Sequence, residues 1–401
     1  MTTTKKIVIG AMAMLALAAC SNEEVIVDNR TGDTINFSPI TGKSLSRAFD
    51  GYCNLSMPDE LTMSAAFFNG STTTPYFFNE AYTKSAGSGY ASSGIVRYWP
   101  NLSDGSKSIT FYGAVNATPS WKQTAGGEPD YTGMVVNAHS VTTDVAQQRD
   151  FLYAVQKATV RPADGVQSIN FRHALSQIEF AGLNENPNIH VEICGVKVVN
   201  VFSKGDFAFP ATTTDDNVVD HNFGGTYPAA DKIGTWSNQR VDATYGVTFD
   251  ATALQASRTS LTITDPAGKE YNANTMYLVP QQLEGWDRTA TPKAVESADT
   301  YFLINAKIWN VAGAAFNPSA DALIWGSGAS GVAAGAKEIA IPAPDTNWQP
   351  GKRYVYTFKF TNAGDGGADP DNGNDVLTPI KLTVTIDDFV DGSSADVPMS
   401  K

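Results

Sequence analysis

The sequence is poor in the residues that build redox, metal and nucleophile sites. Its 401 residues include only three cysteines and four histidines. Two cysteines that lie far apart, Cys53 and Cys194, can form one disulfide but no disulfide framework, and we expect two buried thiols. The histidines are scattered, with no H-E-x-x-H or other paired spacing typical of zinc: His139, His173, His190 and His221. We therefore predict no metal and no cofactor.

Basic residues are also few. The chain has 28 Lys and Arg against 41 Asp and Glu, which gives a formal net charge of −13. Nucleic acid and anionic lipid surfaces both reward clusters of Lys and Arg, so an acidic surface disfavours them as partners. Charged residues make up only 17% of the chain and aromatic residues 10%, which indicates a folded protein and not a solvated tail.

Long apolar runs are absent except at the start of the chain. Lys5 and Lys6 precede an apolar stretch, Ile7–Ala19, and Cys20 follows it directly. This order is typical of a bacterial lipoprotein signal, and the stretch is shorter than the roughly 20 residues of a membrane-spanning helix. An ordinary secretory signal with a chance cysteine, or an uncleaved anchor, would be the alternatives. The small residues before Cys20 favour lipidation at this cysteine, so we expect an exported protein tied to a membrane.

What the sequence does contain is a period-two alternation of apolar and polar residues. Tyr301–Trp309 places Phe302, Ile304, Ala306 and Ile308 on one face, and the ranges 353–360 and 380–387 alternate in the same way. Near the start, 34–37 alternates before Pro39, which would end or edge that strand, and its apolar residues should face a core. Helical periodicity is nearly absent. These patterns predict an all-β protein of two tandem antiparallel β-sandwich domains with one buried face per sheet.

The turn-rich stretch 161–165 marks the expected boundary between the two blocks of strands. Four parts are predicted: a signal peptide (1–19), a lipidated tether with a first strand (20–47), an N-terminal sandwich (48–162) and a C-terminal sandwich (163–401). The mature chain of 382 residues (401 minus 19) is long enough for both domains.

Three motifs resemble functional sites but fail on spacing or context. The G-x-G-x-x-G at 326–331 lacks the parallel strand-turn-helix unit of a dinucleotide site, so we interpret it as a hairpin loop. In the acidic stretch 362–375, Gly373 occupies a position where a calcium ligand would be required. His173 and Ser176 are three residues apart and would point to opposite faces of a strand. No catalytic residues are predicted, and the chain is not expected to be an enzyme.

Several short strings are each unspecific alone but are spread over almost the whole mature chain: Ile35-Asn36-Phe37, Ser46-Arg47-Ala48, Tyr98-Trp99-Pro100, Phe111-Tyr112-Gly113-Ala114, and the ranges 148–154, 171–178, 278–281, 348–354 and 384–389. Taken in order along the chain, they resemble those of the fimbrillin-like proteins of Bacteroidales, the fimbrial subunits and their anchor and tip relatives.

The resemblance implies an outer-membrane lipoprotein with two transthyretin-like β-sandwich domains, whose partners are other fimbrial subunits. It also implies that an Arg-specific protease cuts between Arg47 and Ala48 and so releases the first strand. A sandwich without that strand exposes unpaired backbone groups and an apolar groove, which an extended segment of another subunit can fill. The range 380–389 could donate such a strand, although we favour it as the closing strand of its own domain, which suits a tip or accessory subunit better than a stalk pilin.

The competing hypothesis is a surface lipoprotein that binds glycans or host matrix without polymerising. Exposed aromatic residues would support it, and Trp99, Trp286, Trp325 and Trp348 are the candidates. We expect Trp99 and Trp348 to pack in cores or turns instead, because both lie beside prolines that bound strand-like runs.

Overall fold

The computed structural model describes residues 34–41, 57–85, 89–211, 232–261, 275–286, 299–328, 335–362, 366–376 and 380–388, all within one compact unit. Regular structure in these ranges is β-strand, with a single 3₁₀ turn, η1 (Val145–Gln147). The Asp144 side chain caps this turn by accepting a hydrogen bond from the backbone N–H of Ala146. The predicted all-β class is confirmed.

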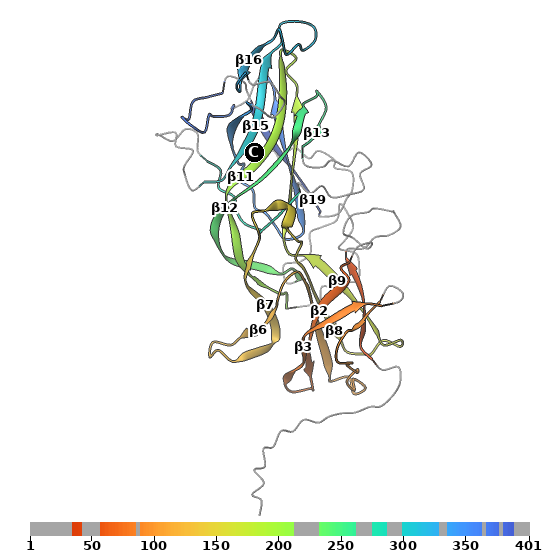
Figure 1. The fold of residues 1–401 in the computed structure, drawn as a ribbon. Helices are drawn as coiled ribbons and strands as arrows, with labels where there is room; N and C mark the ends of the chain where they lie inside the picture. Colours follow the sequence, from red (N-terminus) through yellow and green to blue (C-terminus); the bar gives the residue numbers. More distant parts are fainter. Residues whose placement is uncertain are drawn as a thin grey trace, which may run out of the picture. The chain divides into compact units, whose positions relative to one another are not determined.

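Seven strands close into a barrel (Figure 1). Around the barrel they are β1 (Asn36–Thr41), β4 (Tyr90–Ser92), β3 (Thr73–Lys84), β2 (Glu60–Phe68), β5 (Ser108–Val115), β8 (Leu152–Ala158) and β9 (Val166–His173). All neighbours are antiparallel except β1 and β9, which run parallel. The first block of strands therefore forms a closed barrel that includes one parallel pair, where the sequence predicted antiparallel sheets throughout.

Residues alternate between the inside and the outside of the barrel. On β5, Ile109 and Phe111 join the interior cluster, whereas Tyr112 and Ala114 join a second cluster outside it. The wall is apolar on both faces because its outer face packs against the remaining sheets. Gly113 faces inward, where a Cβ atom would lie 2.6 Å from Cζ of Phe171, so only glycine allows this close approach.

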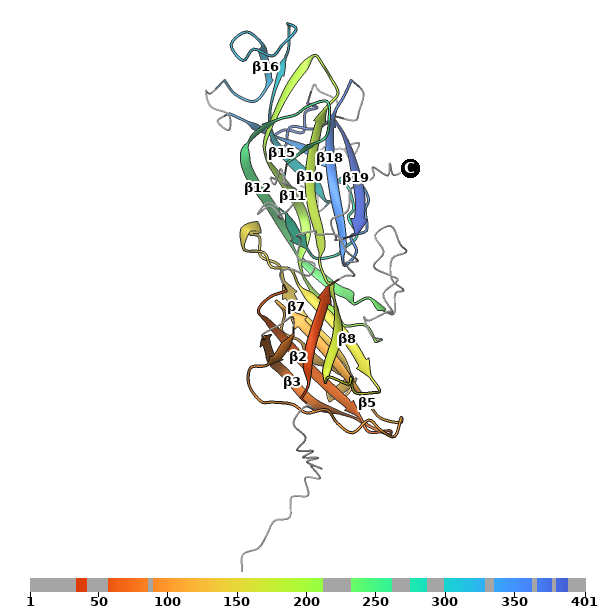
Figure 2. The same cartoon turned by 90° about the vertical axis from the view of Figure 1, so that its right-hand side faces the viewer.

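Two further sheets follow (Figures 1 and 2). One has the order β13 (Thr259–Ser260), β10 (Ser176–Asn184), β18 (Lys352–Phe360) and β19 (Ile380–Asp388), with β14 (Met276–Leu278) also paired to β10. The other has the order β16 (Ala322–Trp325), β15 (Tyr301–Asn310), β11 (Ile189–Ala208), β7 (Pro129–Ser140) and β6 (Ser120–Gln123). In it, β12 (Thr235–Ala253) also pairs with β11, and β17 (Lys337–Pro342) with β15.

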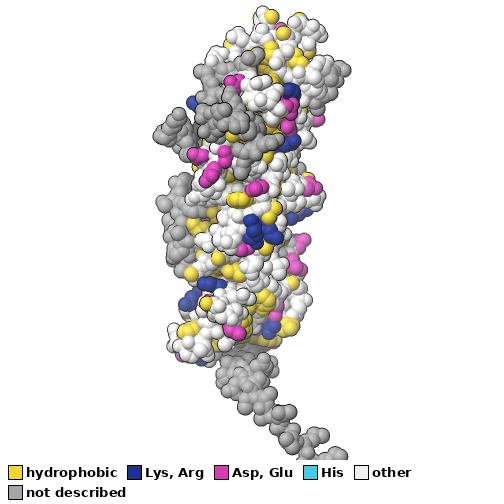
Figure 3. Space-filling model, turned by 90° about the vertical axis from the view of Figure 1, so that its left-hand side faces the viewer, with side chains coloured by type: hydrophobic (Ala, Val, Ile, Leu, Met, Phe, Trp, Pro, Cys, Tyr) yellow, Lys and Arg dark blue, Asp and Glu magenta, His cyan; other side chains and the backbone are white. Residues whose placement is uncertain are grey.

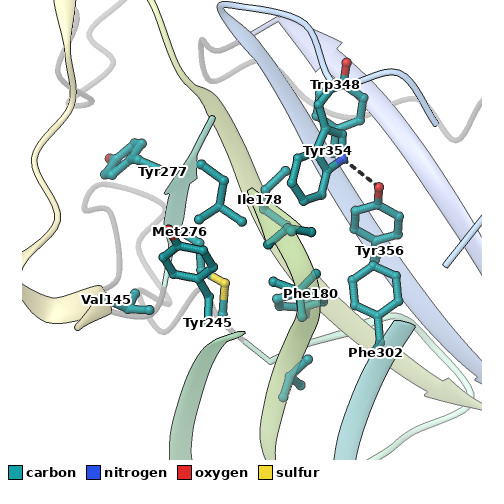
Figure 4. Packing of buried hydrophobic residues seen from close by; sticks show 14 of the residues in the cluster. Val145, Ile178, Phe180, Tyr245, Met276, Tyr277, Phe302, Trp348, Tyr354 and Tyr356 are labelled. Carbon is teal, nitrogen blue, oxygen red and sulfur yellow. Dashed lines mark hydrogen bonds between the residues drawn. The ribbon is translucent and has the colours of Figure 1, made fainter. Parts of the chain in front are cut away.

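The alternation read from the sequence marks the core face of β15 correctly and that of β19 only in part, since Ile386 is 39% exposed while Thr385 is buried. Phe302, Ile304, Ala306 and Ile308 of β15 are all fully buried. On β18, Tyr356 packs against Phe180 and Phe302, and its hydroxyl accepts a hydrogen bond from the Trp348 indole at 2.8 Å (Figure 4). The expected polar face of β18 is wrong, however, since Arg353 and Thr357 are also buried. This strand lies between β10, with which it runs parallel, and β19.

The predicted boundary at 162–163 stays a prediction. Strand β9 follows that boundary in sequence and completes the barrel, while β7 precedes it and pairs with β11. The buried cluster outside the barrel likewise contains residues from both sides of position 162. A division of the chain therefore has to account for β9, which joins the barrel from after the boundary, and for β6 and β7, which join the other sheet from before it.

Candidate functional site

The first strand, β1, lies between β4 and β9 and completes the barrel. It pairs in parallel with β9 from Asn36↔Val166 to Thr41↔Phe171, but with β4 at the single pair Phe37↔Tyr90. We call the surroundings of this strand the β1 seat: β4, β9 and the barrel interior beneath them. The strand continues past Pro39, which pairs with Ile169, instead of ending there.

Pro39 is tolerated because of the edge on which its nitrogen lies. The N–H of Asn36 donates to the carbonyl of Gly165, on the β9 side, at 3.4 Å. Successive residues of a strand direct their N–H groups to opposite edges, so the nitrogen of Pro39, three residues after Asn36, faces β4, beyond the one residue pair that β4 makes. The missing donor therefore breaks no bond of the ladder with β9.

Ile35 and Phe37 point into the barrel, as predicted, and both are fully buried. The Phe37 ring makes edge contacts with Tyr82 at 4.9 Å and with Phe111 at 5.2 Å between ring centroids. Burying two large apolar side chains stabilises the barrel by about 1.5–3 kcal/mol each. Burial also raises the pKa of Tyr82, whose hydroxyl makes no hydrogen bond with any described residue. Without β1, the rings of Tyr82 and Phe111, which we call the aromatic floor, would be open to solvent.

The start of β1 is held by a short segment that we call the strap, Arg97–Trp99. The N–H of Ile35 donates to the Arg97 carbonyl at 2.8 Å, and Thr34 forms an isolated antiparallel bridge with Tyr98. The strap is anchored to the barrel without help from β1. The Trp99 indole donates to the Gly165 carbonyl at 3.0 Å, and Arg97 Nε donates to both carboxylate oxygens of Glu80 at 3.0 and 3.1 Å.

The residues predicted for processing lie beside this site in sequence. Thr41 ends β1 six positions before Arg47, and Cys20 precedes the strand. Cys20, Arg47, Ala48 and Cys53 lie outside the described residues, so lipidation and cleavage stay predictions. A cut after Arg47 would separate β1 from everything that follows it.

The C-terminal strand differs from β1 in its pairing. β19 pairs antiparallel with β18 along its whole length, from Ile380↔Phe360 to Asp388↔Lys352. It is the last strand in its sheet, so among the described strands it has a neighbour on one edge alone. Ile380 and Val384 are buried in the cluster outside the barrel. These contacts agree with our interpretation of this segment as the closing strand of its own sheet.

The other sequence motifs have structural partners. His173 Nδ1 lies 2.5 Å from Asp150 Oδ2, whereas the Ser176 hydroxyl donates to the Gln349 carbonyl at 2.9 Å, so these two residues form no nucleophile pair. In the acidic loop, Asp369 binds Lys337 at 2.9 Å. Cys194 is a buried free thiol, as expected. Within the described ranges, no group of three or more His, Cys, Asp or Glu side chains could hold a metal ion.

Three of the four tryptophans proposed for glycan binding belong to cores. Trp99 and Trp348 are buried, as expected, and Trp286 is buried as well. Trp325 is half-buried, with the Lys337 ammonium 5.0 Å from the centre of its ring. The residues that sequence reasoning missed are the partners of β1, namely Val166–Phe171 and Tyr90. The alternation of Ile169 and Phe171 after a turn at Gly165 was the available signal, but it does not reveal which strand will pair there.

Two further observations concern the surface charge and the helix content. On the face shown in Figure 3, acidic and basic side chains lie interspersed over the described part of the chain. Across the same described ranges, the fold contains no helix with the length and apolar character needed to cross a bilayer.

Comparison with known proteins gives one family match and several matches among solved structures. A family model described as fimbrillin-like matches residues 59–388. A fimbrial protein from Bacteroides vulgatus is 15% identical, with 89% of this chain and 99% of that chain covered and a TM-score of 0.46. A candidate cell adhesion protein from Bacteroides ovatus is 15% identical, with coverage of 91% and 100% and a TM-score of 0.45. One from Parabacteroides distasonis is 9% identical, with coverage of 88% and 97% and a TM-score of 0.44. No curated protein matches the chain.

Proposed function

The chain belongs to the fimbrillin-like family, and from that premise we propose that it is a fimbrial subunit whose strand β1 is a removable placeholder. Membership places it among structural and adhesion proteins of the cell surface and not in an enzyme family. The proposed sequence of events begins with export and lipidation at Cys20 on the outer membrane. Cleavage between Arg47 and Ala48 follows, and a strand of another subunit then replaces β1.

One observation carries this proposal: β1 fills a gap between two strands and is also the part of the barrel that one nearby cut would detach. Its loss would uncover the edge of β9 from Val166 to Phe171 together with the floor at Tyr82 and Phe111. An incoming strand with apolar residues at alternate positions would satisfy both the backbone groups and the apolar floor. The strap and Tyr90 are already in place to receive it.

We further propose a tip or accessory position for this subunit. A stalk repeat must both accept a strand and donate one. β19 already pairs with β18 over its whole length and buries Ile380 and Val384, so releasing it would break its own sheet. A subunit whose β1 seat accepts a strand, but whose last strand stays in its own sheet, suits the end or the side of a polymer.

The test uses an Arg-specific protease on the purified precursor and on two matched variants. Arg47→Lys should resist the cut that detaches β1, whereas Arg30→Lys removes a site that precedes β1 and should behave like the wild type. Expected results are an Ala48 N-terminus and loss of the fragment that carries β1 in the wild type and Arg30→Lys, and neither in Arg47→Lys. Assemblies that form equally without the cut would overturn the placeholder role.

The roles of the two ends are tested separately. Cys20→Ala should release the protein from membranes, and retention would disprove the lipid anchor. Deleting 389–401, which leaves β19 intact, should not prevent the cut protein from accepting a donor strand. If the deletion abolishes ladder formation while the fold is kept, the protein is a stalk pilin and not a tip or accessory subunit.

A further inference from the structure

A pocket of about 430 Å³ lies where the start of β12 meets the segments around Pro280 and Trp348. Its volume falls in the range of roughly 300–1,000 Å³ that is usual for small-molecule sites. The described residues that line it include neither an acidic nor a basic side chain, and no histidine. Five are carboxamides, and two are tryptophans: Gln239, Gln281, Gln282, Asn347 and Gln349, with Trp236 and Trp348.

Hydrogen bonds of the backbone hold the lining in place at Asn347 and Gln349. These bonds do not use the side-chain carboxamides of the two residues. The Asn347 carbonyl accepts from the Tyr354 hydroxyl, and the Gln349 N–H donates to the same hydroxyl, each at 2.9 Å. Between them, Trp348 points inward to Tyr356 (Figure 4), so the neighbours of Trp348 direct their side chains away from that core. Within the described part of the chain, the carboxamides of Asn347 and Gln349 make no hydrogen bond.

Trp236 supplies an aromatic wall in a fixed orientation. Its indole N–H donates to the Ala174 carbonyl at 2.6 Å, and its ring contacts Phe207 at 5.3 Å between centroids. The ring is half-buried, so part of it is open on the pocket side. With the N–H already bonded, the ring offers a ligand apolar contact without another donor.

These features restrict the class of ligand. A lining without cations gives no partner to a phosphate or carboxylate, and one without carboxylates gives none to a metal ion or an amine. A purely apolar ligand would desolvate the free carboxamides without replacing their bonds to water. What remains is a neutral ligand with one apolar face and many hydroxyl groups. We propose that this pocket is a saccharide-binding site in which a neutral sugar ring rests on Trp236 and bonds to Asn347 and Gln349.

The site is independent of the β1 seat, so it goes beyond the proposed function and can be tested on the uncut mature chain. The probes are maltose, cellobiose, lactose and diacetylchitobiose, with glucuronic acid as the anionic comparison. Calorimetric titration should show binding of one or more neutral disaccharides with a Kd of about 1 mM or below. Glucuronic acid should bind no better than these neutral sugars.

Variants separate the pocket from other aromatic surface. Asn347→Ala and Gln349→Ala should each weaken binding by about tenfold, as expected for a lost hydrogen bond in a polar site. Trp236→Ala should weaken it at least as much, and unchanged near-UV circular dichroism of the Asn347 and Gln349 variants guards against misfolding. Trp325→Ala is the matched control and should bind like the wild type.

Three results would overturn the proposal. One is that none of the neutral sugars binds at about 10 mM. Another is sugar binding that survives all three pocket substitutions. The third is an extended proline-containing peptide that binds more tightly and displaces the sugar, which would make the pocket a peptide site. Failure of strand exchange would leave all of these measurements unaffected, so the two proposals fail separately.

Discussion

The first and last described strands of this protein are secured in opposite ways. β1 runs parallel to β9 and has neighbours on both edges, whereas β19 runs antiparallel to β18 and lies at the end of its sheet. Removing a strand from between two neighbours leaves a slot of the right width for another strand, because both edges keep their spacing. Removing an edge strand merely moves the edge inward. This difference supports the proposal that β1 is replaceable and that β19 stays in its own sheet.

The largest expected effect comes from the anchor of β1. Phe37→Ala should lower the free energy of unfolding of the uncut protein by about 3–5 kcal/mol, because a fully buried aromatic ring is lost. After cutting at Arg47, the variant should also release β1 much faster than the wild type does. Urea unfolding and the rate of peptide loss measure the two effects. Phe78→Ala is the control, since that ring is 44% exposed and should cost less than about 1 kcal/mol. Equal losses for both variants would mean that Phe37 does not hold the strand.

The matching substitution in β19 should behave differently. Ile380→Ala should cost about 2–5 kcal/mol, because this side chain is 2% exposed within the core outside the barrel. The loss should be the same in the uncut protein and in the protein that has lost β1, as measured by urea unfolding of both forms. If the cost depended on the presence of β1, the two ends of the chain would be energetically coupled. The contrast between β1 and β19 would then fail.

An intermediate effect is expected from pH at the junction between β7 and β11. Burial lowers the pKa of His139 to about 4 from its ordinary value of 6.5. The unfolded chain binds a proton here more readily than the folded chain does, so stability is complete above pH 6.5 and falls as the pH drops from about 6.5 towards 4. The ring is partly exposed, so we expect a loss of about 1–2 kcal/mol across this window.

His139→Phe should flatten that part of the stability profile and leave the slope below pH 4 in place. The same flattening should occur whether β1 is present or absent, since His139 packs against Phe151 and Trp236 and not against the β1 seat. A profile in which the substitution matters only before cutting would show that the junction senses the first strand.

The smallest effect concerns the strap. Glu80→Gln removes the charge that pairs with Arg97, a contact that raises the pKa of the guanidinium through their hydrogen bond. The pair is partly exposed, so the expected loss of stability is about 0.2–1 kcal/mol and should shrink at high salt. Release of β1 after cutting should accelerate a few-fold in low salt. Lys107→Gln, which breaks an exposed pair with Asp104, should leave that rate unchanged.

Much of the architecture was predictable because it depends on local patterns. Period-two alternation identified β15, β18 and β19 and the core-facing residues of β15 and β18, and it placed Ile35 and Phe37 inward at the start of the chain. In β19 it failed at Ile386, which is 39% exposed. It did not identify the exposed face of β18, because burial of Arg353 and Thr357 depends on what packs over that face. Pro39 misled the prediction of the end of β1 because the effect of its missing N–H depends on which edge of the strand is paired. The sequence does not show which edge that is.

By itself, the sequence determined the all-β class, most of the core-facing residues of the alternating strands and an arginine placed after the first strand. These follow from the alternation of side chains along a strand and from the residue types themselves. Only the tertiary structure decided that β1 runs parallel to β9 inside a closed barrel, and that Trp236, Asn347 and Gln349 surround one pocket. Strand pairing and pocket formation join residues far apart in the chain, and backbone hydrogen bonds are chemically alike in every strand. No local pattern therefore encodes which strands will meet.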